Sequence, residues 1–273
     1  MIDNLGIIAG NGDYPILVAK GARKSGIKRI ITAALIGETK KEIESVSDVV
    51  CWIEIGQLEK LILFFKKNDI SQVIMAGQIT PTRLFGRLKL DLRMIKLLAK
   101  IKMKGAEPIF STVARELSKD GIELMDSSVF LKDQLAHKGL MTGKKIEKKY
   151  LKDIEFGVKI AKAVADLDIG QTIVVKEKAI IAVEAIEGTD ATIKRASQLA
   201  GSDVVVIKVG KKKQDMRFDI PIVGLKTLEI MKEAGAKVLA VEAGKSLILD
   251  KLRFLEEARL SGIHIYGITE ENT

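Results

Sequence analysis

Short apolar runs alternate with segments of helical periodicity through the first half of the chain, and this alternation restricts the fold more than any other feature. Alternating strands and helices of such lengths form a parallel sheet covered by helices. We therefore predict a Rossmann-like parallel-sheet domain over residues 1–131. The expected strands are 5–9, 29–35, 72–76 and 123–125, and the expected helices are 14–25, 58–67 and 108–119.

The pattern changes in the second half of the chain. Residues 132–150 are rich in lysine and lack clear periodicity, so we expect a linker there. Apolar runs 172–175 and 179–186 are separated by only three residues, too few for a crossover, and must form an antiparallel hairpin. Residues 151–273 are therefore predicted to be a C-terminal mixed α/β catalytic domain. Its other expected helices are 151–167, 190–200, 225–234 and 250–260, and its other expected strands are 204–209, 237–241 and 263–268.

Composition narrows the classes of partner. A net charge of +9 favours an anionic partner. Only 4% of the residues are aromatic, and no basic patch is interleaved with aromatic residues, which argues against nucleic acid. One cysteine and two histidines are too few for a structural zinc site, so a catalytic metal is expected to be Mg²⁺ or Mn²⁺ held by oxygen.

The segment KKKQDMRFDIPIVG (211–224) is the strongest candidate for a site. It follows a predicted buried strand and places Asp215 and Asp219 four positions apart around Arg217. Carboxylates can hold a divalent metal, and neighbouring guanidinium and ammonium groups can hold phosphate, which together suit attack on a phosphoryl centre. The alternative is a charged turn in which Asp and Arg pair for structure.

The opening segment GIIAGNGDYP (6–15) predicts a glycine-rich turn between a strand and a helix, where a phosphate or ribose can approach the backbone. The match to a dinucleotide fingerprint is poor, because Pro15 stands where the third glycine belongs and no acid is clearly placed after the second strand. Gln78 follows the third expected strand, at the end where ligands of open α/β sheets bind.

Two further strand ends carry polar residues. Glu187 to Asp190 join the hairpin to a helix, where Thr189 or Asp190 can act as the N-cap, while Glu187 is left for a sugar or a metal. If strand 237–241 lies beside strand 204–209, Glu242 faces the same crevice as Asp215.

Residues 83–104 combine eight cations and one acid with an apolar stripe. A basic amphipathic helix of this kind either lies on an anionic membrane surface or packs its stripe into its own domain, which is the commoner case. The stripe consists of Leu84, Leu88, Leu92, Ile95 and Leu98.

Seven segments of the chain, in this order, resemble the LpxI-type UDP-2,3-diacylglucosamine pyrophosphatases of lipid A biosynthesis. The most specific parts are EGTD and QDMRFDIP. The segments are GIIAGNGDYP, AGQITPTRLF, GAEPIF, LDIGQTIVV, AVEAIEGTD, KVGKKKQDMRFDIPIVG and VEAGKSLILDK.

The resemblance implies a metal-dependent hydrolase that cleaves the pyrophosphate of UDP-2,3-diacylglucosamine to UMP and lipid X, with the substrate held between the two domains. Mg²⁺ is the implied cation. The essential aspartate of the family's QD-x-R motif falls on Asp215, with Asp219 as its neighbour. We expect these two residues to bind the metal or orient water, with Arg217 and Lys208 neutralising phosphate charge. The expected substrate-binding residues are Gly10, Asn11, Gly12, Gln78, Gln171, Glu187, Gly188, Thr189, Asp190, Lys208, Gln214 and Glu242.

The start of the chain lacks the features of a secretory leader, and no apolar stretch reaches bilayer length, so we expect a cytoplasmic protein. The net positive charge and the basic amphipathic segment lead us to expect transient, peripheral contact with the inner membrane. The expected partner is the lipid-linked UDP-sugar, with no nucleic acid, and a homodimer is left open. Two alternatives remain: a nicotinamide-dependent oxidoreductase, and a non-catalytic module that binds an anionic surface or nucleic acid.

Overall fold

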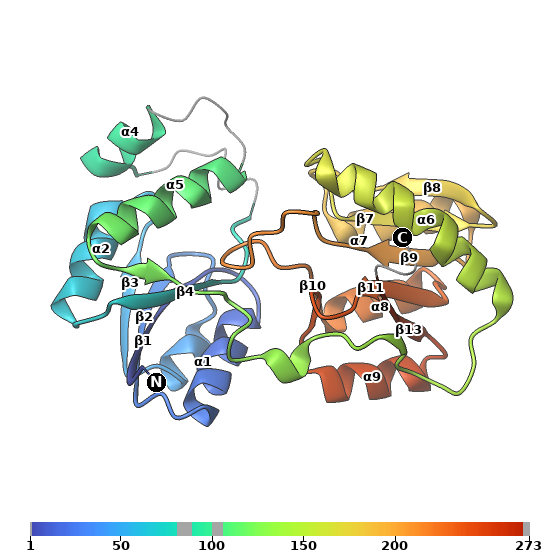
Figure 1. Cartoon of the computed structure of the whole chain (residues 1–273), viewed down its shortest axis with the longest axis horizontal. Helices are drawn as coiled ribbons and strands as arrows, with labels where there is room; N and C mark the ends of the chain where they lie inside the picture. The colour runs from blue at the N-terminus through green and yellow to red at the C-terminus, as the bar shows by residue number, and fades with distance from the viewer. Residues whose placement is uncertain (1, 81–88, 100–105, 270–273) are drawn as a thin grey trace. The chain divides into compact units, whose positions relative to one another are not determined.

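The computed structural model describes residues 2–80, 89–99 and 106–269, and it divides into two compact units (Figure 1). Unit 1 consists of Met1–Lys132 together with Asp215–Asp219, and unit 2 consists of Asp133–Gln214 with Ile220–Thr273. The short segment Asp215–Asp219 therefore belongs to unit 1, although unit 2 flanks it on both sides in the sequence.

Unit 1 is built on a five-stranded sheet of order β3-β2-β1-β4-β5, in which every pair is parallel. The chain moves outward from β1 to β3 and then returns to β4, so the strand order reverses between β1 and β4. Ligands of open parallel sheets bind outside the carboxyl ends of the strands at such a point. The strands are β1 (Asn4–Ala9), β2 (Arg29–Leu35), β3 (Val49–Ile53), β4 (Gln72–Ala76) and β5 (Glu123–Leu124).

Helices α2 (Leu58–Lys67), α4 (Leu92–Leu98) and α5 (Ala106–Lys119) share one core with this sheet. Helix α2 forms because Leu58, Leu61, Ile62 and Phe65 recur at helical spacing, and all four are buried there. Helix α1 (Tyr14–Lys24) contacts β1 and β4, and a short 3-10 helix spans Lys41–Ser45.

Unit 2 contains a six-stranded mixed sheet of order β6-β13-β11-β9-β7-β8. Strands β9, β11 and β13 are parallel, while β7 runs antiparallel to β9 and forms the predicted hairpin with β8. Glu177 and Lys178 at the hairpin turn have φ of 49° and 60°, and their amides donate to the Asp153 carboxylate at 3.1 and 2.8 Å. The strands are β6 (Gly139–Leu140), β7 (Thr172–Lys176), β8 (Ala179–Val183), β9 (Val205–Lys208), β11 (Val238–Glu242) and β13 (His264–Ile268).

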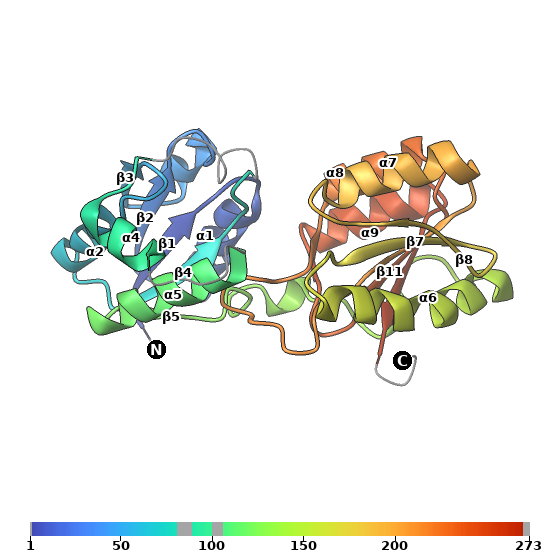
Figure 2. The same ribbon diagram turned by 90° about the horizontal axis from the view of Figure 1, so that it is seen from above.

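Helices cover both faces of this sheet (Figure 2). Alternate residues along each strand enter two separate cores, for example Val206 on one face and Ile207 on the other. The first core is shared with α7 (Thr189–Ala200), α8 (Leu225–Glu233) and α9 (Lys251–Leu260). The second core is shared with α6 (Lys148–Asp166).

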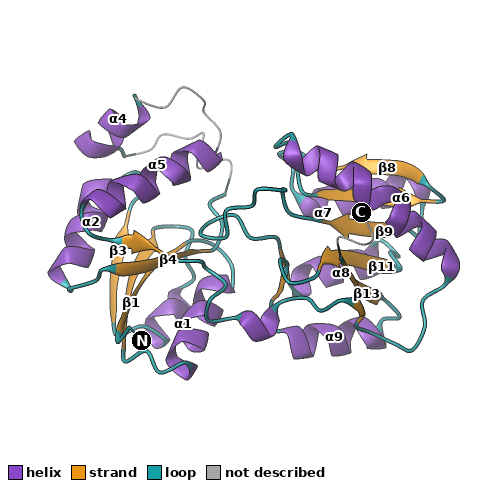
Figure 3. Cartoon of the chain, viewed as in Figure 1, coloured by secondary structure: helices purple, strands orange, loops and turns teal. Residues whose placement is uncertain are grey.

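The predicted α/β class, with a parallel first sheet and an antiparallel hairpin in the second half, is confirmed (Figure 3). Strand β3 was not among the expected strands, and of the two-residue strands only β5 was predicted, because two residues carry no periodicity. Strand β6 lies within the lysine-rich stretch expected to be a linker, and β10 (Ile222–Val223) pairs in parallel with β12 (Leu247–Ile248). The described helices include none with the length and apolar character needed to cross a membrane.

The basic amphipathic segment is described only in part, since residues 83–88 and 100–104 lie outside the described ranges. Within α4, Leu97 is buried, whereas Leu92 and Ile95 are exposed. The expectation that the stripe packs into its own domain is therefore wrong for Leu92 and Ile95.

We predict that Phe65→Ala destabilises unit 1 by about 3–5 kcal/mol, because the Phe65 ring is completely buried. Leu63→Ala, one half-turn away on the same helix, should change stability by about 0.5 kcal/mol or less, since that side chain is largely exposed. Urea unfolding followed by circular dichroism measures both. Equal losses would contradict the assigned orientation of α2.

Candidate active site

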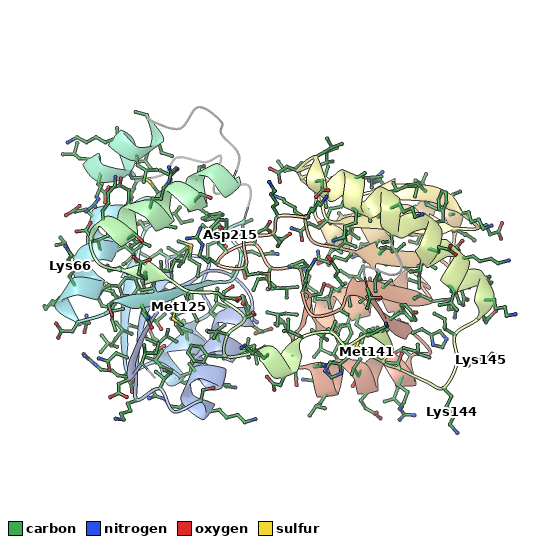
Figure 4. The ribbon with its side chains drawn as sticks, in the orientation of Figure 1. Lys66, Met125, Met141, Lys144, Lys145 and Asp215 are labelled. Carbon is green, nitrogen blue, oxygen red and sulfur yellow. The ribbon has the colours of Figure 1, made fainter. Side chains whose placement is uncertain are left out.

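The predicted reactive segment is a loop that is anchored to unit 1. Ser127 holds it through the Met216 carbonyl, which accepts from the Ser127 amide at 2.9 Å and from its hydroxyl at 3.1 Å. Phe218 packs against the unit 1 core and against Phe110, with ring centroids 5.8 Å apart. Asp215 is labelled on this loop in Figure 4.

Asp215 and Arg217 form a paired group on the loop. The Asp215 carboxylate accepts from Arg217 Nε at 2.9 Å, from Nη2 at 2.7 Å and from the Arg217 amide at 3.1 Å. Chiefly because the Arg217 side chain donates to it, the pKa of Asp215 lies below its usual range, so the carboxylate is ionised at neutral pH. The Arg217 side chain is 43% exposed, so solvent and ligands can still reach the guanidinium.

Asp219 lies on the same turn, because its amide donates to the Asp215 carbonyl at 3.0 Å. No group of three or more His, Cys, Asp or Glu side chains within residues 2–80, 89–99 and 106–269 is arranged to hold a metal. Mg²⁺ commonly uses only one or two carboxylates together with substrate phosphates and water. Asp215 and Asp219 supply the oxygen donors that such an ion takes, from positions on one turn.

The glycine-rich turn meets the end of β4 at the point where the strand order reverses. Asn11 and Gln78 form an antiparallel bridge, with N–O distances of 2.7 and 3.2 Å. A Cβ on Gly10 would lie 2.6 Å from the Gln78 carbonyl, so Gly10 is required by the close approach of two backbones. Gly12 has φ of +93°, and a Cβ there would meet nothing within 4 Å. The structure thus brings the glycine-rich turn and Gln78, which the sequence indicated as separate segments, together through the Asn11–Gln78 bridge.

Glu38 was missed from the sequence. It lies just beyond β2, where no acid was expected, and is only 5% exposed. Its carboxylate accepts from the Thr80 amide at 3.1 Å and from the Thr80 hydroxyl at 2.8 Å, which ties the ends of β2 and β4 together. The sequence could have indicated Glu38 only by its position, three residues after the predicted strand 29–35.

In unit 2, Lys208 ends β9 beside the start of α7 and is 8% exposed. Its ammonium donates to the Thr189 hydroxyl at 2.7 Å, and that hydroxyl donates to the buried Glu184 carboxylate at 3.0 Å. Within the described residues, no carboxylate forms an ion pair with Lys208. A buried ammonium beside a helix N-terminus is suited to bind an anion.

The residues that precede α7 differ in their contacts. The expected side-chain cap is wrong: Gly188, at φ +82°, is the N-cap residue, and no side chain caps the helix. Glu187 pairs with Arg195 at 2.9 Å, and Asp190 pairs with Lys226 at 2.9 Å.

Glu242 ends β11, which does lie beside β9. Its carboxylate accepts from Lys162 at 2.6 Å, from Lys245 at 2.9 Å and from the Gly210 amide at 2.9 Å. Burial opposes ionisation of Glu242, but these donors outweigh it and lower the pKa of the carboxyl. Lys162 also donates to the Gly210 carbonyl at 3.0 Å, so both backbone groups of Gly210 are held.

Two other predicted residues lie near these groups in unit 2. The Gln171 backbone amide donates to the Glu184 carboxylate at 3.3 Å, and the Gln171 backbone carbonyl accepts from the Val209 backbone amide at 2.9 Å. The Gln214 side chain accepts from the Lys211 amide. The sequence did not indicate Glu184 or Lys162, because their partners lie in other elements.

Glu242→Gln should destabilise unit 2 by about 2 kcal/mol at pH 7, since it weakens hydrogen bonds to a buried charge. The native pKa of Glu242 is lowered, so its stabilisation is present above the unfolded pKa and is lost as pH falls through the native pKa. The difference between wild type and variant should therefore shrink below about pH 4.

Urea unfolding of wild type and variant at pH 7 and below about pH 4 measures this difference in stability. Glu256→Gln is the matched control, because Glu256 pairs with Arg259 on the exposed side of α9. A loss of stability that is the same at both pH values would contradict the assigned charge of Glu242.

Two family models match the chain. The LpxI N-terminal domain matches residues 4–134, and the LpxI C-terminal domain matches residues 137–266. A curated relative, UDP-2,3-diacylglucosamine pyrophosphatase LpxI from Caulobacter vibrioides, is 26% identical over 276 residues, which cover 97% of each chain.

Similarity to solved structures is weak. Phosphoribosylglycinamide synthetase from Anaerococcus prevotii is 12% identical with a TM-score of 0.26, over 75% of this chain and 44% of that one. Isoflavone reductase is 12% identical with a TM-score of 0.31, over 99% of this chain and 80% of that one. TM-scores this low support no inference about fold or function. The two family matches follow each other along nearly the whole sequence, and the chain belongs to the LpxI family.

Proposed function

We propose that this protein hydrolyses UDP-2,3-diacylglucosamine to UMP and 2,3-diacylglucosamine 1-phosphate (lipid X). Membership of the LpxI family and a full-length relative that bears this activity in its name support the proposal. The observation that carries it is the loop on which Arg217 holds the Asp215 carboxylate, on the motif through which the chain resembles the family.

In the proposed reaction, water attacks one phosphorus of the anhydride and the bridging P–O bond breaks. The oxygen of water stays on the phosphorus that is attacked, the other phosphate leaves with the bridging oxygen, and the protons of water pass to the site or to solvent. Asp215, ionised at neutral pH, orients the water, and Arg217 neutralises negative charge that grows on the phosphate oxygens.

We assign phosphate binding also to Lys208 and the N-terminus of α7. An ammonium held by Thr189 and a helix N-terminus without a side-chain cap supply positive charge and N–H donors at one place. Glu242 positions Gly210, which begins the stretch that leads to the reactive loop. The strand-end group of Asn11, Gly12 and Gln78 is the proposed site for the uridine side.

A divalent cation, when bound, would neutralise phosphate charge and polarise the bond that breaks. We propose that Asp215 and Asp219 hold it, because they are oxygen donors on one turn. The nicotinamide alternative is less favoured, since Pro15 falls in the first turn of α1, where a dinucleotide fingerprint needs a glycine.

Asp215→Asn should reduce UMP release from UDP-2,3-diacylglucosamine by about a hundredfold or more, because one charged contact to the transition state is lost. EDTA should abolish wild-type activity, and Mg²⁺ should restore it. Asp3→Asn, which removes a carboxylate from an exposed pair with Lys28, is the control and should leave the rate unchanged. Full activity of Asp215→Asn would eliminate the proposed role of Asp215, whereas a wild type that releases no UMP even with added Mg²⁺ would favour a non-catalytic binding module.

Lys208→Met should lower kcat/KM by about ten- to a hundredfold, because it removes a charged donor to phosphate. Lys159→Met, on the exposed side of α6, is the matched control. Steady-state kinetics on both variants, with circular dichroism to verify folding, decide the role. An unchanged kcat/KM for folded Lys208→Met would remove Lys208 from the site.

A further inference from the structure

Helix α4 presents an apolar stripe to solvent. Leu92 is 76% exposed and Ile95 is 48% exposed, and with Lys96 they occupy one continuous arc of the helix. The opposite side is fixed: Leu97 is buried, and Arg93 pairs with Glu59 at 3.1 Å, with Glu116 at 3.4 Å and with Asp120. The exposure of Leu92 and Ile95 thus follows from how α4 is held.

Helix α2 lies against α4 and also exposes an aliphatic side chain. Leu63 is 56% exposed and lies between Lys60 and Lys67 on the outer side of the helix. The two helices are joined at their N-termini, where the Asp91 carboxylate accepts from the Glu59 amide at 2.7 Å and from the Met94 amide at 2.8 Å. An open groove of about 480 Å³, lined by Lys60, Leu63, Phe64, Lys67 and Asp91 among others, lies along this junction. We call Lys60, Leu63, Lys67, Leu92, Ile95 and Lys96 the α2–α4 surface.

The charge of the α2–α4 surface is positive. Within the described ranges, no carboxylate forms an ion pair with Lys60, Lys67 or Lys96. Of the neighbouring acids, Glu59 pairs with Arg93 and Glu54 pairs with Lys89 at 2.9 Å, while the Asp91 carboxylate accepts from two backbone amides. The three lysines therefore lie beside the exposed aliphatic side chains, and no carboxylate of the described residues pairs with their positive charges.

We propose that the α2–α4 surface docks the protein on an anionic lipid bilayer. Exposed aliphatic side chains can enter the boundary between headgroups and acyl chains, while surrounding lysines contact anionic headgroups. A second copy of this chain fits the surface less well, because a two-fold contact would bring the same unpaired lysines of both copies together. The proposal is independent of the hydrolase chemistry, since it uses none of the residues assigned to it.

The test is flotation of the full-length protein with vesicles of phosphatidylglycerol mixed with phosphatidylcholine, compared with vesicles of phosphatidylcholine alone. Wild type should bind the anionic vesicles and should be released by salt. Two triple variants, Leu63→Ser/Leu92→Ser/Ile95→Ser and Lys60→Glu/Lys67→Glu/Lys96→Glu, should each bind about tenfold more weakly or worse.

Matched controls carry the same kinds of substitution elsewhere. Leu252→Ser/Leu260→Ser removes exposed leucines of α9, and Lys144→Glu/Lys145→Glu/Lys159→Glu makes the same change of net charge in unit 2. Both should bind as wild type does. Circular dichroism and UMP release from detergent-dispersed substrate, expected to be unchanged, separate loss of docking from misfolding and from failure of the proposed chemistry.

Three results would overturn the proposal. These are absence of wild-type binding to anionic vesicles, binding that survives either triple substitution, and equal loss of binding in the charge-matched control. Sedimentation that shows a dimer dissociated by the Leu→Ser variant would assign the surface to a second copy instead.

Discussion

The double hydrogen bond between Arg217 and Asp215 is the interaction on which the proposed chemistry of this protein depends. A guanidinium in this geometry stabilises the ionised carboxylate and fixes its orientation. The pair is formed within one short loop, so it needs no support from distant side chains. Its place in the molecule is set separately, by Ser127 and by the packing of Phe218.

Charged groups at the other strand ends show how the fold prepares a polar site without leaving charges uncompensated. Glu38 is held by Thr80, and Glu242 is held by Lys162, Lys245 and the Gly210 amide. Each of these carboxylates joins two segments that are distant in sequence. Lys208 is a buried cation that, among the described residues, contacts a hydroxyl but forms no ion pair with a carboxylate. An incompletely compensated buried cation is what recognition of a phosphate requires.

Much of the fold could be predicted because periodicity decides it. Residues 58–67 formed a helix within the predicted bounds since four apolar residues recur on one face, and the three-residue spacing after residue 175 left only a hairpin. The short strands β6, β10 and β12 carry no such pattern. For the site, the sequence predicted which residue types lie at the strand ends, but it did not predict their hydrogen-bond partners. The hydrogen bonds from Thr80 to Glu38 and from Ser127 to Met216 join residues far apart in the sequence, so no local sequence pattern indicates them.

The most direct measurement is the titration of the Asp215 side-chain carboxyl by ¹³C NMR in wild type and in Arg217→Met. Since hydrogen bonds from Arg217 are the main cause of the lowered pKa, the wild-type carboxyl should titrate below the ordinary aspartate value of about 3.9. In the variant it should titrate at distinctly higher pH. The same titration curve in both proteins, or a wild-type carboxyl that titrates at or above the ordinary value, would contradict the account.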